Sequence, residues 1–341
     1  MSYGLNDFIT GMPKAELHVH IEGCVEPLML LRLAERNGVD IPYRDEDEVW
    51  AAQDYGEPAL DNFLKYHENC LRVLQTGQDF YELAYAFFKR SAEENIVYLE
   101  IMFETQAHIS RGLVFSECFD GLNQARRDGR RDFGIESNWI MSFQRDHSAE
   151  SSMEILDMAK PFKDEIIGVG LDNYEVNNFA LKFVEVFRRA REEGYRLTSH
   201  CDCNQQNSIE HIRQCLELLQ VERIDHGLHV IDSPELTAMV RESQIPLTMC
   251  PTWRPSDPAP RRLESIREML ELGLLVSINT DDPAEFASRY LNNIFIEMHK
   301  HGSYTKDEIV RLTRNAFTSA WISEDAKAHY LEKLEKYVAG K

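Results

Sequence analysis

Histidines and a carboxylate stand where several apolar runs of the sequence end. His18 and His20 close the first run, His200 closes a later run, and Asp281 follows the last. Two residues apart on a strand, the imidazoles of His18 and His20 point to the same side. Imidazole nitrogens with a carboxylate oxygen are a donor set typical of zinc. We therefore predict that these four residues hold one Zn²⁺, while Fe²⁺ or Mn²⁺ fit the same donors.

Other histidines and cysteines are weaker candidates. Cys201 and Cys203 form a Cys-x-Cys pair, but two further zinc ligands at a suitable spacing are missing nearby, so buried or mouth-lining thiols are favoured. His229 follows a strand-end motif and is expected to have an ordinary structural role. The remaining histidines are expected on the surface or as satisfied core residues; they are His67, His108, His147, His211 and His299.

Short β-branched runs alternate with longer amphipathic stretches along the whole chain, which is typical of parallel βα units. Eight runs are predicted as strands: Ala15–Ile21, Ile96–Phe103, Ser137–Phe143, Ile166–Leu171, Arg196–His200, Arg223–Leu228, Pro246–Cys250 and Leu275–Asn279. Eight such units predict an α/β fold, the (β/α)8 TIM barrel. In that fold the carboxyl ends of all strands meet at one face, so the four metal candidates should meet there too.

Helical patterns fill the intervals between the predicted strands. Pro27–Asn37, Phe179–Gly194 and Leu263–Gly273 have apolar residues at helical spacing and end near Gly or Asn. Residues 44–78 do not fit a simple βα unit, and we interpret them as a helical insertion after strand 1. Residues 1–341 are expected to form one metal-dependent hydrolase barrel domain, since no linker or repeat divides them.

The composition restricts the partners. The chain has 341 residues and a formal net charge of −21, so phosphate backbones and anionic membrane surfaces would be repelled. We expect no nucleic-acid or membrane partner and a small-molecule substrate. Seven scattered cysteines and the lack of a signal-peptide pattern favour the cytoplasm. The oligomeric state is left open.

Four segments together resemble the adenosine/adenine deaminase family of the amidohydrolase superfamily, nearest its adenine-deaminase branch. They carry the metal candidates or lie beside them, and are 14–23 (KAELHVHIEG), 223–227 (RIDHG), 250–252 (CPT) and 279–283 (NTDDP). The resemblance implies that His226 orients or deprotonates a metal-activated water, and that Asp282 accepts a hydrogen bond from the attacking hydroxide or the leaving amine. Gly170 and Asp172 are expected to contact the substrate.

One departure bears on the substrate. The family follows its third zinc histidine with Ala-Gly-Glu, whose glutamate protonates a ring nitrogen, whereas Cys203 stands at that general-acid position here. A thiol of pKa ~8.5 is a poor general acid. Asp202 or Glu175 is a candidate replacement. The loop after strand seven carries Trp253 and Arg254, and Arg254 is a candidate for binding an anionic substrate group.

The sequence thus predicts a zinc-dependent aminohydrolase that deaminates a purine-like or related nitrogen heterocycle, not adenosine itself. Two alternatives stay open: a metal hydrolase of the same scaffold with a different leaving group, and a metal-binding homologue without catalysis, because a fold alone does not decide function.

Overall fold

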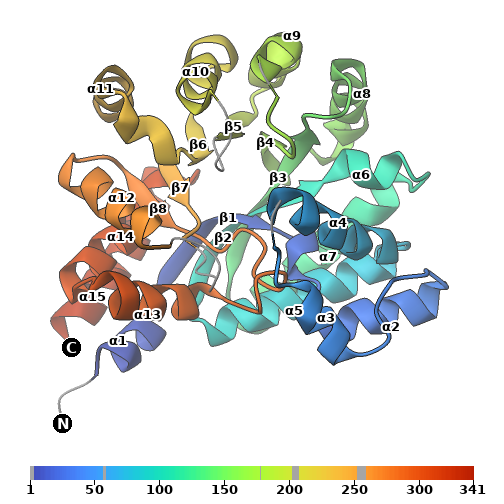
Figure 1. Cartoon of the computed structure of the whole chain (residues 1–341), viewed down its shortest axis with the longest axis horizontal. Coiled ribbons are helices and arrows are strands. Elements are labelled where there is room, and N and C mark those ends of the chain that lie inside the picture. The colour runs from blue at the N-terminus through green and yellow to red at the C-terminus, as the bar shows by residue number, and fades with distance from the viewer. Residues whose placement is uncertain (1–3, 57–58, 177, 202–206, 252–258) are drawn as a thin grey trace.

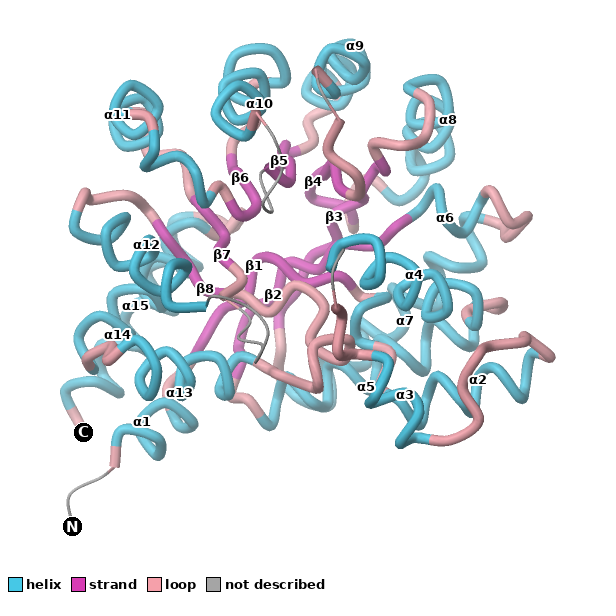
Figure 2. Tube along the Cα trace, in the orientation of Figure 1, coloured by secondary structure: helices cyan, strands magenta, loops and turns pink. Residues whose placement is uncertain are grey.

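The computed structural model describes residues 4–56, 59–176, 178–201, 207–251 and 259–341. Eight parallel strands form one sheet in chain order, at the centre of a ring of helices (Figures 1 and 2). The strands are β1 (Lys14–His20), β2 (Ile96–Glu104), β3 (Glu136–Gln144), β4 (Ile166–Asp172), β5 (Arg196–Cys201), β6 (Arg223–His226), β7 (Leu247–Met249) and β8 (Val276–Ile278). The predicted (β/α)8 fold is confirmed.

Hydrogen bonds between the ends of β8 and β1 bring the two edges of the sheet together. The amide of His20 donates to the carbonyl oxygen of Asp281 at 2.8 Å. The amide of Asp281 donates to the carbonyl oxygen of His18 at 3.2 Å. The amide of Leu17 donates to the Asn279 side chain at 2.8 Å. This contact nearly closes the barrel, and it sets Asp281 directly beside the two histidines of β1.

Helices cover the outside of the barrel (Figure 1). The α-helices are α1 (Leu5–Gly11), α2 (Pro27–Asn37), α3 (Glu46–Ala52), α4 (Ala59–Val73), α5 (Gly77–Glu93), α6 (Thr105–Ile109), α7 (Phe115–Phe133), α8 (Ala149–Ala159), α9 (Phe179–Glu192), α10 (Ser208–Gln214), α11 (Pro234–Glu242), α12 (Ala259–Glu271), α13 (Leu291–Gly302), α14 (Lys306–Ser319) and α15 (Glu324–Ala339). Short turns η1 (Glu22–Cys24), η2 (Lys160–Phe162) and η4 (Leu228–Asp232) are 3₁₀, and η3 (Cys215–Leu219) is a π-helix. None of the helices in the described ranges has the length and hydropathy to cross a membrane.

The strands have buried side chains on both faces, as parallel sheets covered by helices do. All seven residues of β1 are buried, and so are all residues of β6, β7 and β8. The helices fit their predicted signals: α2 begins at Pro27 and ends before Gly38, which has a left-handed φ of 63°. The first and last helices also meet, because Phe8 of α1 packs against Tyr337 of α15.

Helices α3 and α4 occupy the segment predicted as an insertion, and side chains of this segment are hydrogen-bonded to the loop after β8. Gln53 donates to the carbonyl oxygen of Ala284 at 2.9 Å and accepts from the amide of Ala287 at 3.0 Å. The Tyr55 hydroxyl donates to the carbonyl oxygen of Glu285 at 3.0 Å. This segment is therefore joined to the loop after β8, which also carries Asp281 and Asp282.

Several predicted boundaries were wrong by a few residues. The sixth strand ends at His226 rather than Leu228, because His226 and Gly227 adopt left-handed φ angles of 68° and 78°, which turn the chain away from the extended conformation. The eighth strand is shorter than predicted, since it ends at Ile278 before the turn to Asp281. Helix α9 ends at Glu192, two residues before Gly194.

Candidate metal centre and active site

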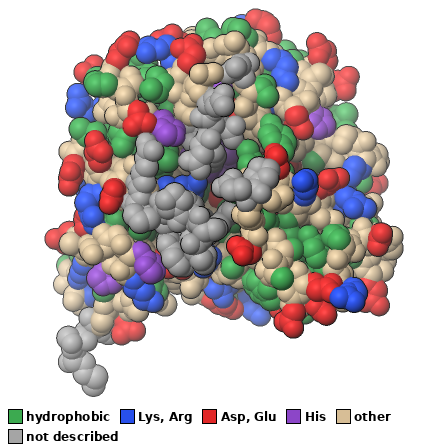
Figure 3. Space-filling model, in the orientation of Figure 1, with side chains coloured by type: hydrophobic (Ala, Val, Ile, Leu, Met, Phe, Trp, Pro, Cys, Tyr) green, Lys and Arg blue, Asp and Glu red, His purple; other side chains and the backbone are tan. Residues whose placement is uncertain are grey.

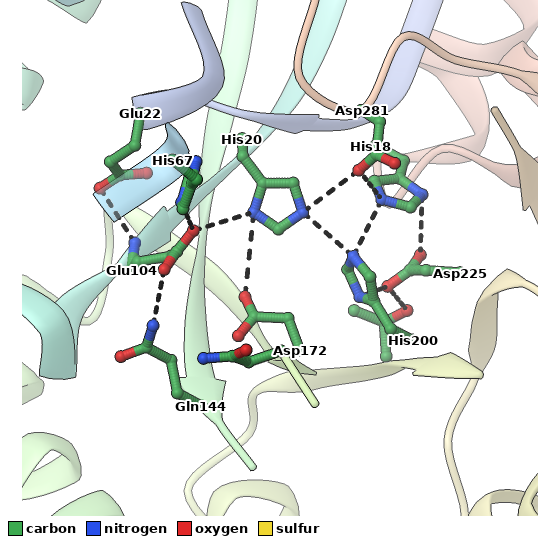
Figure 4. Close-up of polar contacts among 12 residues, drawn as sticks. His18, His20, Glu22, His67, Glu104, Gln144, Asp172, His200, Asp225 and Asp281 are labelled. Atoms are coloured by element: carbon green, nitrogen blue, oxygen red, sulfur yellow. Dashed lines mark hydrogen bonds and ion pairs between the residues drawn. The ribbon is translucent and has the colours of Figure 1, made fainter. Parts of the chain in front are cut away.

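The four predicted ligands lie together at the carboxyl ends of β1, β5 and β8, with one donor atom of each within 4.8 Å of the others. The Nε2 atoms of His18 and His20 are each 3.0 Å from Nε2 of His200. Oδ1 of Asp281 lies 3.2 Å from His18 Nε2 and 3.6 Å from His20 Nε2. Figure 4 shows these side chains facing one another.

This arrangement fits a tetrahedral metal. Zinc with ligand distances of ~2.0–2.1 Å requires donor atoms roughly 3.3 Å apart in a tetrahedron, and the observed separations of 3.0–3.6 Å bracket that value. Imidazole nitrogens this close, with lone pairs toward a common point, would repel one another without a cation between them. Burial and the neighbouring His200 lower the pKa of His20 to about 3, which keeps its imidazole neutral and able to bind a metal.

The outer nitrogens of two of the histidines face fixed polar partners. Nδ1 of His18 lies 3.1 Å from Thr248 Oγ1, and Nδ1 of His200 lies 3.5 Å from Asp225 Oδ2. Asp225 is fully buried and accepts hydrogen bonds from the hydroxyls of Thr198 and Thr248 at 2.7 and 2.8 Å. Such partners orient a ligating imidazole so that Nε2 points at the metal.

Two residues of this site have an unusual backbone conformation. His226 and Asp281 both have left-handed φ angles, 68° and 66°. Non-glycine residues rarely adopt this region, and where they do the surrounding structure must hold them there. Here the strained backbone turns both side chains inward, with His226 Nε2 3.8 Å from Asp281 Oδ2.

His226 and Asp282 are the two predicted proton-handling residues, and both are buried. Burial lowers the pKa of His226 well below its ordinary value, so the neutral imidazole can accept a proton. Burial, with the carboxylates of Asp281 and Glu285 nearby, raises the pKa of Asp282 well above its usual range. A cation bound to Asp281 would offset that repulsion.

A second buried polar cluster, which was not predicted from the sequence, adjoins the site. His67 of α4 lies between two carboxylates: its Nε2 is 2.6 Å from Glu104 Oε1, and its Nδ1 is 2.9 Å from Glu285 Oε1. Glu104 Oε1 also faces Nδ1 of His20 at 3.9 Å. A histidine in a helix pattern gave no signal for this role; only the docking of α4 onto the barrel mouth reveals it.

Three of the other histidines, His108, His211 and His229, each contact a carboxylate. Nε2 of the buried His108 lies 2.8 Å from Glu22 Oε1, and Nδ1 of the buried His211 lies 2.6 Å from Glu175 Oε1. His229 Nδ1 is 2.6 Å from Asp232 Oδ2. These contacts are those of satisfied structural histidines.

Two of the residues expected to contact substrate lie on β4. Asp172 ends the strand, with Oδ2 3.8 Å from His20 Nδ1, and burial together with Glu104 raises the pKa of Asp172 well above its usual range. Gly170 packs so closely on β3 that an added Cβ would lie 2.9 Å from Ser142 Oγ. Asp202, Cys203, Trp253 and Arg254 lie outside the described residues.

Comparison with known proteins shows the family to which this chain is similar. The adenosine deaminase family matches residues 13–337. An uncharacterized deaminase of Schizosaccharomyces pombe is 43% identical over 332 residues, which cover 97% of each chain. An adenine deaminase of Psychrobacter cryohalolentis is 40% identical over 337 residues, covering 97% of this chain and 99% of that protein.

Solved structures give the same result. The adenine deaminase from Arthrobacter aurescens superposes with a TM-score of 0.88 at 34% identity, covering 96% of this chain and 100% of that one. An amidohydrolase from Burkholderia ambifaria with bound Zn has a TM-score of 0.88 at 26% identity, covering 100% and 96%. The protein is a hydrolase acting on C–N bonds, a deaminase of the amidohydrolase superfamily. The chain belongs to the adenosine deaminase family.

Proposed function

We propose that this deaminase uses one zinc ion, held by His18, His20, His200 and Asp281, to remove an amino group from a purine-like or related nitrogen heterocycle. The observation that carries the proposal is the convergence of the four donor atoms from three strand ends within 4.8 Å. The Burkholderia relative with bound Zn supports the choice of metal.

The residues around the cluster fit the chemistry of deamination. A metal bound there supplies Lewis acidity that makes water nucleophilic at neutral pH. His226 accepts the proton that the water loses, and Asp282 accepts a hydrogen bond from the attacking oxygen or the leaving amine. A C–O bond forms and the C–N bond breaks as the amine takes up a proton, so water and the amino-heterocycle become the oxo-heterocycle and ammonia.

The substrate is proposed to differ from adenosine. Relatives named adenine deaminase point to a free base or a base-like ring. Cys203 in place of the family's glutamate would remove general acid catalysis worth roughly 10²–10⁴-fold, so weak turnover of adenosine and adenine is expected. Asp202 or Glu175 is proposed to protonate the true substrate, and Trp253 and Arg254 to contact it.

The net charge would repel phosphate backbones and anionic membrane surfaces, so we propose a small-molecule substrate. On the face shown in Figure 3, acidic and basic side chains are interspersed around the rim, within a chain of net charge −21. We also propose a cytoplasmic location, because the six cysteines that the structure describes form no disulfide with one another.

The proposed function is tested by ammonia release from a panel of aminopurines, aminopterins, aminopyrimidines and aminotriazines. We expect turnover of at least one ring other than adenosine or adenine. Turnover in the usual enzyme range of ~1–10³ s⁻¹ on adenosine or adenine would contradict the interpretation of Cys203. Release of a different leaving group, with no ammonia from any ring, would contradict the proposed reaction.

A further inference from the structure

We infer that His67, carried by the insertion helix α4, is a positioning residue that sets metal affinity by orienting Glu104 against the outer nitrogen of His20. The inference rests on the proposed metal site. It adds helix α4, which supplies none of the four proposed ligands, to the residues that determine how tightly the metal binds.

Of the three histidine ligands, His20 has its outer nitrogen farthest from a polar partner, at 3.8 Å, against 3.1 Å for His18 and 3.5 Å for His200. Nδ1 of His20 is buried and has no hydrogen-bond partner among the described residues. Ligating histidines almost always donate their second ring N–H, commonly to a carboxylate. Two carboxylates are near, Glu104 Oε1 at 3.9 Å and Asp172 Oδ2 at 3.8 Å (Figure 4). Glu104 and Asp172 are therefore the two candidate acceptors for the outer N–H of His20.

Glu104 is the acceptor that the surrounding structure holds in place. Its Oε1 is 2.6 Å from His67 Nε2, and its Oε2 accepts from the Gln144 amide at 2.7 Å. Its backbone amide donates to Glu22 Oε1 at 3.0 Å. Both oxygens of the Glu104 carboxylate are thus held by neighbouring side chains, and Oε1 faces His20. A carboxylate held in this way is suited to orient a metal-binding histidine.

His67 is itself fixed by contacts within α4 and with the loop after β8. Its other nitrogen lies 2.9 Å from Glu285 Oε1, and its ring stacks on Phe63, one turn earlier in α4, with centroids 5.7 Å apart. Phe63 also stacks on Phe286 at 5.2 Å. Docking of α4 therefore determines where Glu104 points, and the insertion becomes part of the metal centre.

The test measures the dissociation constant of Zn²⁺ for metal-stripped protein, by competition with a chelating indicator. His67→Phe keeps the ring that stacks on Phe63 and removes both polar contacts. Loss of outer-shell partners typically costs about 10–100-fold in metal affinity, and this variant should show a loss in that range. His67→Gln, whose amide can still donate to Glu104, should lose less of its Zn²⁺ affinity.

The matched control is His299→Phe on α13, where His299 Nδ1 lies 2.8 Å from the carbonyl oxygen of Tyr304. The Zn²⁺ affinity of this control should equal that of wild type.

The outcomes separate the possible failures. Folded His67→Phe with wild-type Zn²⁺ affinity, even with a lower melting temperature of the metal-free protein, would overturn the inference and leave His67 a merely structural residue. If His67→Phe does not fold, the affinity of His67→Gln decides in the same way. Asp172→Asn is measured in parallel. Weaker Zn²⁺ binding by Asp172→Asn, with wild-type affinity in the His67 variants, would assign the acceptor to Asp172 and would also overturn the inference. Wild-type protein that binds no Zn²⁺ would instead refute the proposed metal site.

Discussion

Gly23 lies so close to Asp282 that a Cβ added at Gly23 would stand 2.1 Å from Asp282 Oδ1. The carbonyl oxygen of Gly23 also accepts a hydrogen bond from the amide of Ala284 at 3.0 Å. The turn after β1 and the turn after β8 are therefore packed together with no room for a side chain between them. This close approach fixes the position of Asp282 beside the proposed metal.

Gly23→Ala should displace the Asp282 side chain and lower kcat by about 10²-fold, because a catalytic group misplaced by ~1 Å can cost that much. Gly56→Ala is the control, since no atom lies within 4 Å of a Cβ added there. Both variants are compared by steady-state ammonia release on the substrate found in the panel. Unchanged kcat in Gly23→Ala would show that Asp282 is not needed where the structure holds it.

His226→Gln should lower kcat by roughly 10²–10⁴-fold, the range for loss of a general base, while the metal content stays that of wild type. Its low pKa also predicts that wild-type kcat does not fall between pH 8 and 6.5 through protonation of His226, because the group is already neutral there. Metal analysis and a pH–rate profile check the two statements. A variant that loses its metal would instead make His226 a ligand.

Lys14 gives a prediction about stability rather than activity. Its buried Nζ donates to the carbonyl oxygens of Ile9 and Met12 at 2.8 and 2.6 Å, and burial lowers the pKa of Lys14 to about 7 from 10.5. Between pH 7 and 10.5, Lys14 therefore binds a proton in the unfolded chain but not in the folded chain. The free energy of unfolding should rise with pH in this range, by about 1.4 kcal/mol per pH unit from this group.

Lys14→Met should therefore lose that part of the slope. Urea unfolding of wild type and Lys14→Met at pH 7, 8 and 9 measures the difference. Parallel pH dependences of the unfolding free energy in the two proteins would mean that Lys14 keeps its proton in the folded state.

The strand ends of the site could be predicted because their signal is local. His18 and His20 show the period of a strand, and the convergence of all strand ends is a property of the barrel itself. Bounds were less accurate where the backbone departs from regular geometry, as at His226, because a left-handed φ in a histidine has no clear mark in the sequence.

The polar network behind His20 could not be predicted. His67, Glu104 and Glu285 come from a helix, a strand and a loop far apart in the chain, and each alone is typical of an ordinary charged residue. Only the docking of α4, through contacts such as Gln53 with Ala284, brings them together.

The central claim is that the four clustered side chains hold a metal that the reaction needs. The most direct measurement is ammonia release by protein stripped with a chelator and then titrated with Zn²⁺, in wild type and in Asp281→Asn. We predict that stripping abolishes activity, that Zn²⁺ restores it in wild type with saturation at one equivalent per chain, and that Asp281→Asn requires far more Zn²⁺ or stays inactive. Undiminished ammonia release from fully stripped wild-type protein would contradict the account.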